Sequence, residues 1–297
     1  MVKWKRGRRS DDLIDRRGTR APRIGTGGIP IPLGALRGLG VPGLIVVVGL
    51  VVFLNFFGGG TGVDPGVGPL DGSPDPADGD SSYPTSDPDA ELVDFLSFVL
   101  DDIQDEWDEL FRVSGLQYER AELVLFDGYT DSACGGATEA IGPHYCPVDR
   151  RVYLDLGFFR QLSEQFGAKG DFAQAYVLSH EIGHHVQNLL GTMEQVQQSI
   201  PSDDGNDLSI RLELQADCFA GIWGYSTFQR DLLESGDLQE ALVAAAAVGD
   251  DRIQQSITGR VNPETWTHGS SDQRVEWYTR GFDEGDPQSC DTFSGAI

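Results

Sequence analysis

Positive charge, histidine and closely spaced cysteines are all scarce in this chain of 297 residues. It has 22 Lys and Arg against 47 Asp and Glu, which gives a net charge of −25 at pH 7. Residues 1–40 hold ten of those basic residues and only three acids, so the rest of the chain carries 12 basic and 44 acidic side chains. A surface this acidic repels phosphate, which argues against nucleic acid as a partner. The basic arm directly precedes an apolar run, and membrane topology with anionic-lipid contact is the simpler explanation for it.

The four cysteines form no CxxC pair, and structural zinc knuckles need such close thiol pairs. We expect two disulfides instead, with Cys134–Cys146 closing a short loop and Cys218–Cys290 following by elimination. Four cysteines allow three connectivities, so this pairing is a hypothesis.

Only one long apolar run occurs, at residues 41–57, where Asn55 is the one strongly polar side chain. At about 1.5 Å per helical residue the run spans about 26 Å, near the short limit for a bilayer crossing. A buried core helix and a cleaved signal peptide are alternatives, but an uncleaved signal anchor in contact with membrane lipid fits best. Positive charge before the run predicts a single-pass protein of the cell membrane, with a cytoplasmic N-terminus and an extracytoplasmic C-terminal part.

Composition divides the chain into four parts. Residues 1–40 are the basic cytoplasmic arm, and residues 41–57 are the predicted transmembrane helix. Residues 58–88, rich in Gly, Pro and Asp, are expected to be a disordered linker. Residues 89–297 are expected to form one compact domain.

Hydrophobic periodicity predicts that this domain is mainly helical, of the α+β class, with a small sheet. An amphipathic helix begins near Asp89 and is expected to stop at Gly115. Residues 131–147, rich in Gly and Cys, are expected to be a loop. The expected strands are 121–128 and 151–156, and the further expected helices are 157–166, 171–190, 207–230, 237–260 and 272–281.

Two of the five histidines lie four residues apart in the run His180-Glu-Ile-Gly-His184. Helical spacing puts residues four apart on one face, so two imidazoles can share one metal ion with the Glu181 carboxylate beside it. This HExxH pattern is typical of zinc hydrolases. The alternative is a helix with two solvated histidines.

A catalytic zinc site needs a third protein ligand and one position left open. Zinc peptidases that take a histidine six residues after the second one are excluded, because Leu190 occupies that position. Helical periodicity instead puts Glu213 and Asp217 on one seam that is otherwise small or apolar. Buried carboxylates need partners, and zinc for Glu213 and an imidazole N–H for Asp217 would supply them. An exposed acidic helix face is the alternative.

The segments HEIGHHVQNLLG, RLELQADCFAGIW and WTHGSSDQRVEWYTRGFDEGDPQSCDTF resemble the bacterial neutral zinc metallopeptidase family of single-span membrane proteins. HExxH followed by ExxxD is also similar, more distantly, to glutamate-type zinc peptidases such as thermolysin. This resemblance implies a zincin-like fold that binds Zn²⁺ through His180, His184 and Glu213. It also implies that Glu181 is the general base and that Asp217 orients a ligand histidine.

The remaining histidines yield weaker candidates. An oxyanion needs a hydrogen-bond donor, and His268 is the first candidate, with Tyr278 behind it. His185 lies about 100° around the helix from His184 and is expected to pack or hydrogen-bond, whereas His144 could line the cleft. The zincin-like resemblance also implies that the strand 151–156 is the edge on which an extended peptide pairs.

The sequence therefore predicts a membrane-anchored zinc metallopeptidase with a peptide or protein substrate. One alternative is a binding or scaffold protein with a structural metal site and no catalysis. Another is a zinc hydrolase of other amide bonds, including those of cell-wall peptides. The oligomeric state is not predicted.

Overall fold

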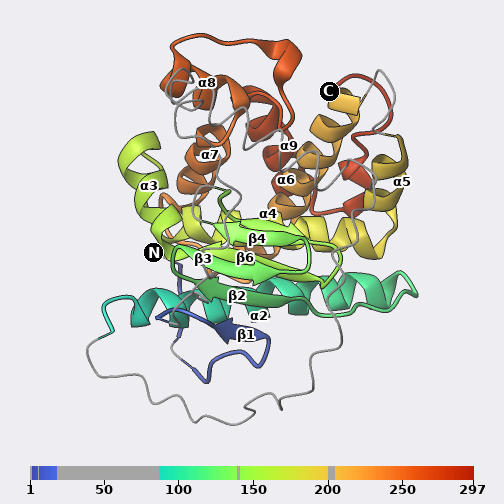
Figure 1. Cartoon of the computed structure of the whole chain (residues 1–297). Helices are drawn as coiled ribbons and strands as arrows, with labels where there is room; N and C mark the ends of the chain where they lie inside the picture. Colours follow the sequence, from blue (N-terminus) through green and yellow to red (C-terminus); the bar gives the residue numbers. More distant parts are fainter. Residues whose placement is uncertain (1, 6, 19–86, 139–140, 200–204) are drawn as a thin grey trace, which may run out of the picture.

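The computed structural model describes residues 2–5, 7–18, 87–138, 141–199 and 205–297. Its main sheet has the strand order β1-β2-β6-β5, in which β1, β2 and β6 run parallel and β5 is antiparallel to β6 (Figure 1). A separate hairpin joins β3 and β4. The strands are β1 (Leu13–Asp15), β2 (Glu122–Phe126), β3 (Tyr129–Ser132), β4 (Gly135–Thr138), β5 (His144–Cys146) and β6 (Arg151–Asp155).

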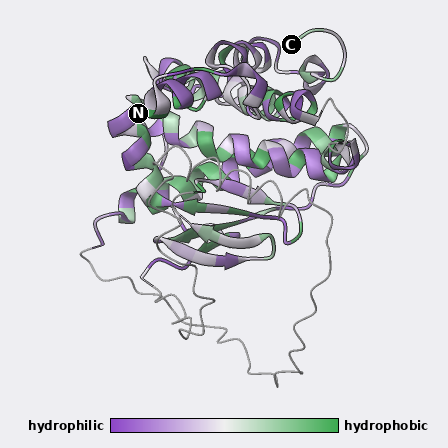
Figure 2. Ribbon diagram, turned by 45° about the horizontal axis from the view of Figure 1, so that its top comes forward, coloured by the Kyte–Doolittle hydropathy of each residue, from purple (hydrophilic) through white to green (hydrophobic). Residues whose placement is uncertain are grey.

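Helices form most of the described chain, which confirms the predicted α+β class with a small sheet. They are α2 (Ala90–Val113), α3 (Leu156–Phe166), α4 (Asp171–Leu189), α5 (Thr192–Ser199), α6 (Gly205–Gln229), α7 (Asp237–Ala247), α8 (Asp250–Thr258) and α9 (Ser271–Glu284), with short 3₁₀ turns η2 (Pro263–Thr265) and η3 (Pro287–Cys290). Polar and apolar residues alternate along these helices in Figure 2, as expected for helices with one face buried.

Both faces of the main sheet are buried at β2, since its alternate residues belong to two different hydrophobic clusters. Leu123 and Leu125 join the large core, which includes residues of α2 and α4. Val124 and Phe126 form a smaller cluster with Ala137 of the hairpin. The period of two along β2 thus fixes helices on one face of the sheet and the hairpin on the other.

Helix α4 occupies the centre and packs against α2, α6 and α7. It approaches α6 at Gly183, where an added Cβ would lie 2.9 Å from the carbonyl oxygen of Ala216. A Cβ on Gly221 of α6, by contrast, would collide with the backbone of α9 around Tyr278. Small residues on α6 therefore admit two neighbouring helices rather than one.

The two disulfides have the predicted pairing, Cys134–Cys146 and Cys218–Cys290. The second links α6 to η3, so it holds the C-terminal segment against the helix that carries Glu213.

Two predictions of secondary structure are wrong. The predicted loop 131–147 contains part of β3 and all of β4 and β5. These strands have only three or four residues each, too few for an evident alternation, and β4 also contains two glycines. The predicted helix 237–260 is broken into α7 and α8 at Gly249, where an added Cβ would lie 2.4 Å from the backbone nitrogen of Ser271. This break turns Asp250 toward the loop that precedes α9.

The predicted separation of residues 1–40 from the folded domain is wrong for residues 2–18. Val2 is buried, Trp4 packs against Phe95, and β1 pairs with β2. These contacts make residues 2–5 and 7–18 part of the domain predicted to begin at residue 89. The predicted span 41–57 and nearly all of the predicted linker 58–88 lie outside the described residues. Within the described ranges, no helix is both long enough and apolar enough to cross a membrane.

Candidate metal centre

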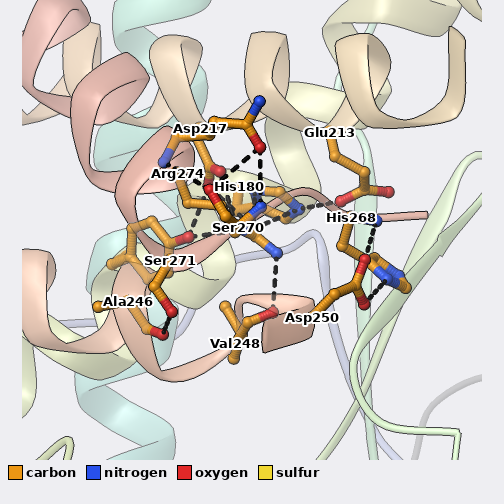
Figure 3. Close-up of polar contacts among 12 residues, drawn as sticks. His180, Glu213, Asp217, Ala246, Val248, Asp250, His268, Ser270, Ser271 and Arg274 are labelled. Atoms are coloured by element: carbon orange, nitrogen blue, oxygen red, sulfur yellow. Dashed lines mark hydrogen bonds and ion pairs between the residues drawn. The ribbon is translucent and has the colours of Figure 1, made fainter. Parts of the chain in front are cut away.

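Helices α4 and α6 bring His180, His184 and Glu213 together at one point (Figure 3 shows His180 and Glu213). The two imidazole rings have centroids 4.8 Å apart. Nε2 of His180 lies 3.2 Å from one oxygen of Glu213, and Nε2 of His184 lies 3.5 Å from the other. One possible ligand atom from each residue lies within 4.8 Å of the others, so the three residues could hold one shared ion.

The opposite nitrogen of each ring is held by an oxygen. Nδ1 of His180 is 2.9 Å from Asp217 Oδ1, and Nδ1 of His184 is 2.8 Å from Gln187 Oε1. The amide nitrogen of Gln187 donates to the carbonyl oxygen of Leu212, so its Oε1 is the atom that faces His184. Since both oxygens accept, each Nδ1 carries the hydrogen and each Nε2 can offer its lone pair to a cation. Two imidazole nitrogens and one carboxylate are a ligand set that fits zinc.

Charged neighbours shift the pKa values of two of the ligand candidates, His180 and Glu213. Burial alone would lower the pKa of His180, but the carboxylates of Asp217 and Glu213 outweigh it and raise the pKa to about 9. Burial alone would raise the pKa of Glu213, but the imidazoles of His184 and His180 hold it well below its usual value. The raised pKa favours a second proton on His180, at Nε2, and a cation that binds there must displace it.

Arg274 of α9 completes the support of His180, and the sequence analysis missed it. Its Nε and Nη2 donate to the two oxygens of Asp217 at 2.8 and 2.9 Å (Figure 3). Tyr176 donates its hydroxyl hydrogen to the same carboxylate at 2.5 Å. Asp217 and Arg274 are both buried, so this bidentate pair fixes the carboxylate that orients His180. No sequence signal joins positions 217 and 274, because the pair forms only when α6 packs on α9.

His268 lies on the loop before α9 and lines the same cleft as Glu181 and Glu213. Its ring is half exposed, and its Nδ1 lies 3.2 Å from Asp250 Oδ1 (Figure 3). The other oxygen of Asp250 accepts the backbone N–H of His268 at 2.7 Å. Desolvation opposes charge on the ring, but the hydrogen bond with Asp250 and the charge of Glu213 raise the pKa of His268 above its usual value.

Tyr278, the second candidate for the oxyanion donor, does not line the cleft. It is buried between α6 and α9, and its ring packs edge-on against Tyr176. Its position in the helix interface excludes the role considered for it.

The cleft has a volume of about 410 Å³. Glu181 and the metal-ligand candidates line it, and Phe158, Val177 and Ile253 add apolar surface. His144, predicted as a possible cleft residue, does line it and stacks on Tyr153.

The edge strand at this cleft is β5, not the predicted strand 151–156. That strand, β6, is flanked on one side by β2 and on the other by β5, so its hydrogen-bonding groups are already paired. Residues 144–146, which form β5, were predicted to be loop, so the edge was assigned to the neighbouring strand.

His185 packs and hydrogen-bonds, as predicted. Its Nε2 lies 2.6 Å from the Glu119 carbonyl oxygen, and its Nδ1 lies 3.0 Å from the Tyr145 hydroxyl. Burial lowers the pKa of His185 to about 4, so the ring is neutral and its Nε2–H donates to Glu119. Asn188 donates to the same hydroxyl at 2.8 Å. This network fixes strand β5, which carries Tyr145, against the helix that carries the two ligand histidines.

Paired histidines on one helix and a glutamate on its neighbour are the arrangement expected of HExxH zinc hydrolases. The chain belongs to the family described as "Putative neutral zinc metallopeptidase", whose model matches residues 2–293. It is 43% identical over 300 residues to the protein named uncharacterized protein YpfJ of Escherichia coli strain K12, with all of both chains covered. It is 52% identical over 190 residues to the uncharacterized proteins Mb2605 of Mycobacterium bovis and Rv2575 of Mycobacterium tuberculosis H37Rv, covering 60% of this chain and 64% of each relative. No solved structure matches the chain.

Proposed function

We propose that the chain is a zinc peptidase whose zinc ion is held by His180, His184 and Glu213. The observation that carries the proposal is the convergence of their ligand atoms within 4.8 Å while the outer nitrogen of each imidazole is already hydrogen-bonded. The family description supports zinc and peptide hydrolysis as the chemistry.

The chain's own residues account for proton transfer. Zinc, when bound, would polarise the scissile carbonyl and lower the pKa of a water molecule. Glu181 accepts a proton from the attacking water and passes it to the amine nitrogen as the C–N bond breaks. His268, held by Asp250, donates a hydrogen bond to the carbonyl oxygen as negative charge develops there. Asp217 and Arg274 keep His180 in the orientation that the ligand set needs.

A peptide or protein substrate suits the cleft because β5 is an edge strand. An extended peptide can add to that edge through backbone hydrogen bonds, with its side chains entering the apolar part of the cleft. The two disulfides support action outside the cytoplasm, because such bonds persist in oxidising compartments. The apolar run 41–57 supports association with membrane lipid.

The test is hydrolysis of a library of unstructured peptides by the zinc-loaded chain and by its Glu181→Gln variant. The variant keeps all three ligand candidates, so we expect it to retain zinc while the rate falls by about 10²- to 10⁴-fold. Equal zinc content and no hydrolysis by either chain, for peptides and cell-wall peptides alike, would instead support a metal-stabilised binding protein.

A further inference from the structure

Residues 2–4 are held to the domain of residues 87–297 by apolar burial and one hydrogen bond. Val2 is only 4% exposed, and its backbone N–H donates to Asp171 at the first turn of α4, at 2.7 Å. The Trp4 ring lies 5.6 Å from Phe95 and 6.4 Å from Phe98, both on α2. These contacts join residues 2–4 to the helix that carries the HExxH motif and to its neighbour.

Backbone pairing continues the attachment. Strand β1 pairs in parallel with β2 from Leu13 opposite Leu123 to Asp15 opposite Leu125. The N–H of Leu123 donates to the Asp12 carbonyl oxygen, and the N–H of Arg16 donates to the Leu125 carbonyl oxygen, both at 2.8 Å. Residues 12–16 therefore satisfy polar groups of β2, a strand whose Leu123, Val124 and Leu125 are fully buried.

Ion pairs join Arg17 and Asp87, which are far apart in the sequence. Arg17 lies 2.8 Å from Asp15 and 2.9 Å from Asp87, and all three side chains are largely buried. The N–H of Gly18 donates to Asp127 at 3.0 Å. Positions 17 and 87, which flank the apolar run 41–57 in the sequence, thus meet in space.

A single crossing of a bilayer cannot satisfy these contacts. It would place the residues before and after the apolar run on opposite sides of about 30 Å of hydrocarbon. A second copy of the chain could not supply β1 either. A single crossing would put the N-terminal segment of every copy on the side of the bilayer opposite residues 87–297.

We propose that residues 2–18 and 87–297 fold together in one compartment, joined by β1–β2 pairing and by the Arg17–Asp87 ion pair. The disulfides support an oxidising compartment for the domain, so residues 2–18, on the proposed localisation, lie outside the cytoplasm with it. This replaces the prediction of a cytoplasmic N-terminus. It does not depend on the proposed catalysis.

The strand order also places the proposed substrate edge relative to residues 18 and 87. In the strand order β1-β2-β6-β5, the segments that lead to residue 18 and away from residue 87 lie at the β1 edge, and the peptide-accepting strand β5 is the opposite edge. The proposed substrate edge therefore lies across the sheet from the two points that connect to the apolar run (Figure 1 shows β1 at the lower edge of the sheet).

Cysteine labelling in cells tests the shared compartment. The chain's four cysteines are all in disulfides, so one new cysteine can be labelled alone. Arg8→Cys probes the N-terminal segment, and Glu276→Cys is the matched probe on α9, with side chains 79% and 69% exposed. With a membrane-impermeant maleimide on spheroplasts of cells that express the full chain, we expect both variants to be labelled to the same extent.

Labelling of Glu276→Cys alone, with Arg8→Cys protected until lysis, would overturn the proposal. Protection of both until lysis would support the shared compartment and overturn its placement outside the cytoplasm, both here and in the proposed function.

A stability measurement tests the packing itself. Trp4→Ala in the purified full chain removes the contacts with Phe95 and Phe98, so we expect the melting temperature to fall by roughly 5–15 °C. Leu116→Ala, at a position 52% exposed, is the control and should change it little. An unchanged melting temperature in Trp4→Ala would show that residues 2–18 are a separate arm and would overturn the proposal.

Discussion

Replacing Arg274 by Met should be one of the most damaging single changes in the domain. The substitution removes both hydrogen bonds to Asp217 and leaves that carboxylate buried, with only Tyr176 and His180 as partners. Removing one partner of a buried ion pair costs about 3–5 kcal/mol, because the remaining charge stays out of water. For a domain of this size that corresponds to a fall in melting temperature of roughly 6–20 °C.

Arg280→Met is the matched control because it makes the same change six residues further along α9. The Arg280 side chain is 45% exposed, lies 3.9 Å from Glu276 and sits over the Trp277 ring. Exposed ion pairs and cation–π contacts of this kind contribute about 1 kcal/mol or less. Thermal unfolding of the metal-free proteins, followed by circular dichroism, gives the comparison.

The same variant should also weaken zinc binding. Loss of the groups that orient a ligand histidine typically costs 10- to 100-fold in metal affinity, and zinc titration against a competing chelator measures it. The free energies of unfolding of Arg274→Met and Arg280→Met could differ by less than 1 kcal/mol, with Arg274→Met binding zinc as tightly as the parent chain. That result would refute the role of Arg274 in fixing Asp217.

Three further changes test the metal-ligand candidates and the residues that pack around them. Burial lowers the pKa of His185 to about 4, so its contribution to stability is complete above pH 6.5 and is lost as the pH falls toward 4. Over that pH range, the free energy of unfolding in urea should fall by about 3 kcal/mol less in His185→Gln than in the parent chain. Equal losses in the two proteins would contradict this. Gly183→Ala should push α4 away from α6 at Ala216 and so reduce zinc affinity, even though alanine favours helix by about 1 kcal/mol. Gly7→Ala is the control because there is open space around its new Cβ, and it should leave the zinc affinity measured by titration unchanged. Zinc at 100 times its dissociation constant should stabilise the chain by about 2.7 kcal/mol in calorimetry, and His184→Ala should abolish that gain; an equal gain in the variant would place the ion elsewhere.

The metal-ligand candidates could be predicted from sequence because each depends on local helical spacing. His180 and His184 are one turn apart, and Glu213 and Asp217 are one turn apart on another helix, so each pair needs only the geometry of its own helix. Which partner buried Asp217 finds, in contrast, depends on how α6 packs on α9. That is why Asp217 was found and Arg274 was not.

The N-terminal strand was missed because its charges were interpreted as a membrane signal. Arg9 and Arg17 contribute to the basic arm in the sequence, yet in the structure they pair with Asp94 and Asp87. A three-residue strand has too few positions for a period of two to be evident. The break at Gly249 was missed for a related reason, since the Ala-rich run before it favours helix and only the contact with Ser271 requires the break.

The most direct test of the zinc site is anomalous diffraction at the zinc edge from crystals of the zinc-loaded chain. We expect one strong peak, about 2.0–2.2 Å from Nε2 of His180, Nε2 of His184 and one carboxylate oxygen of Glu213. A peak that lacks Glu213 as a ligand, or no peak between α4 and α6, would contradict it.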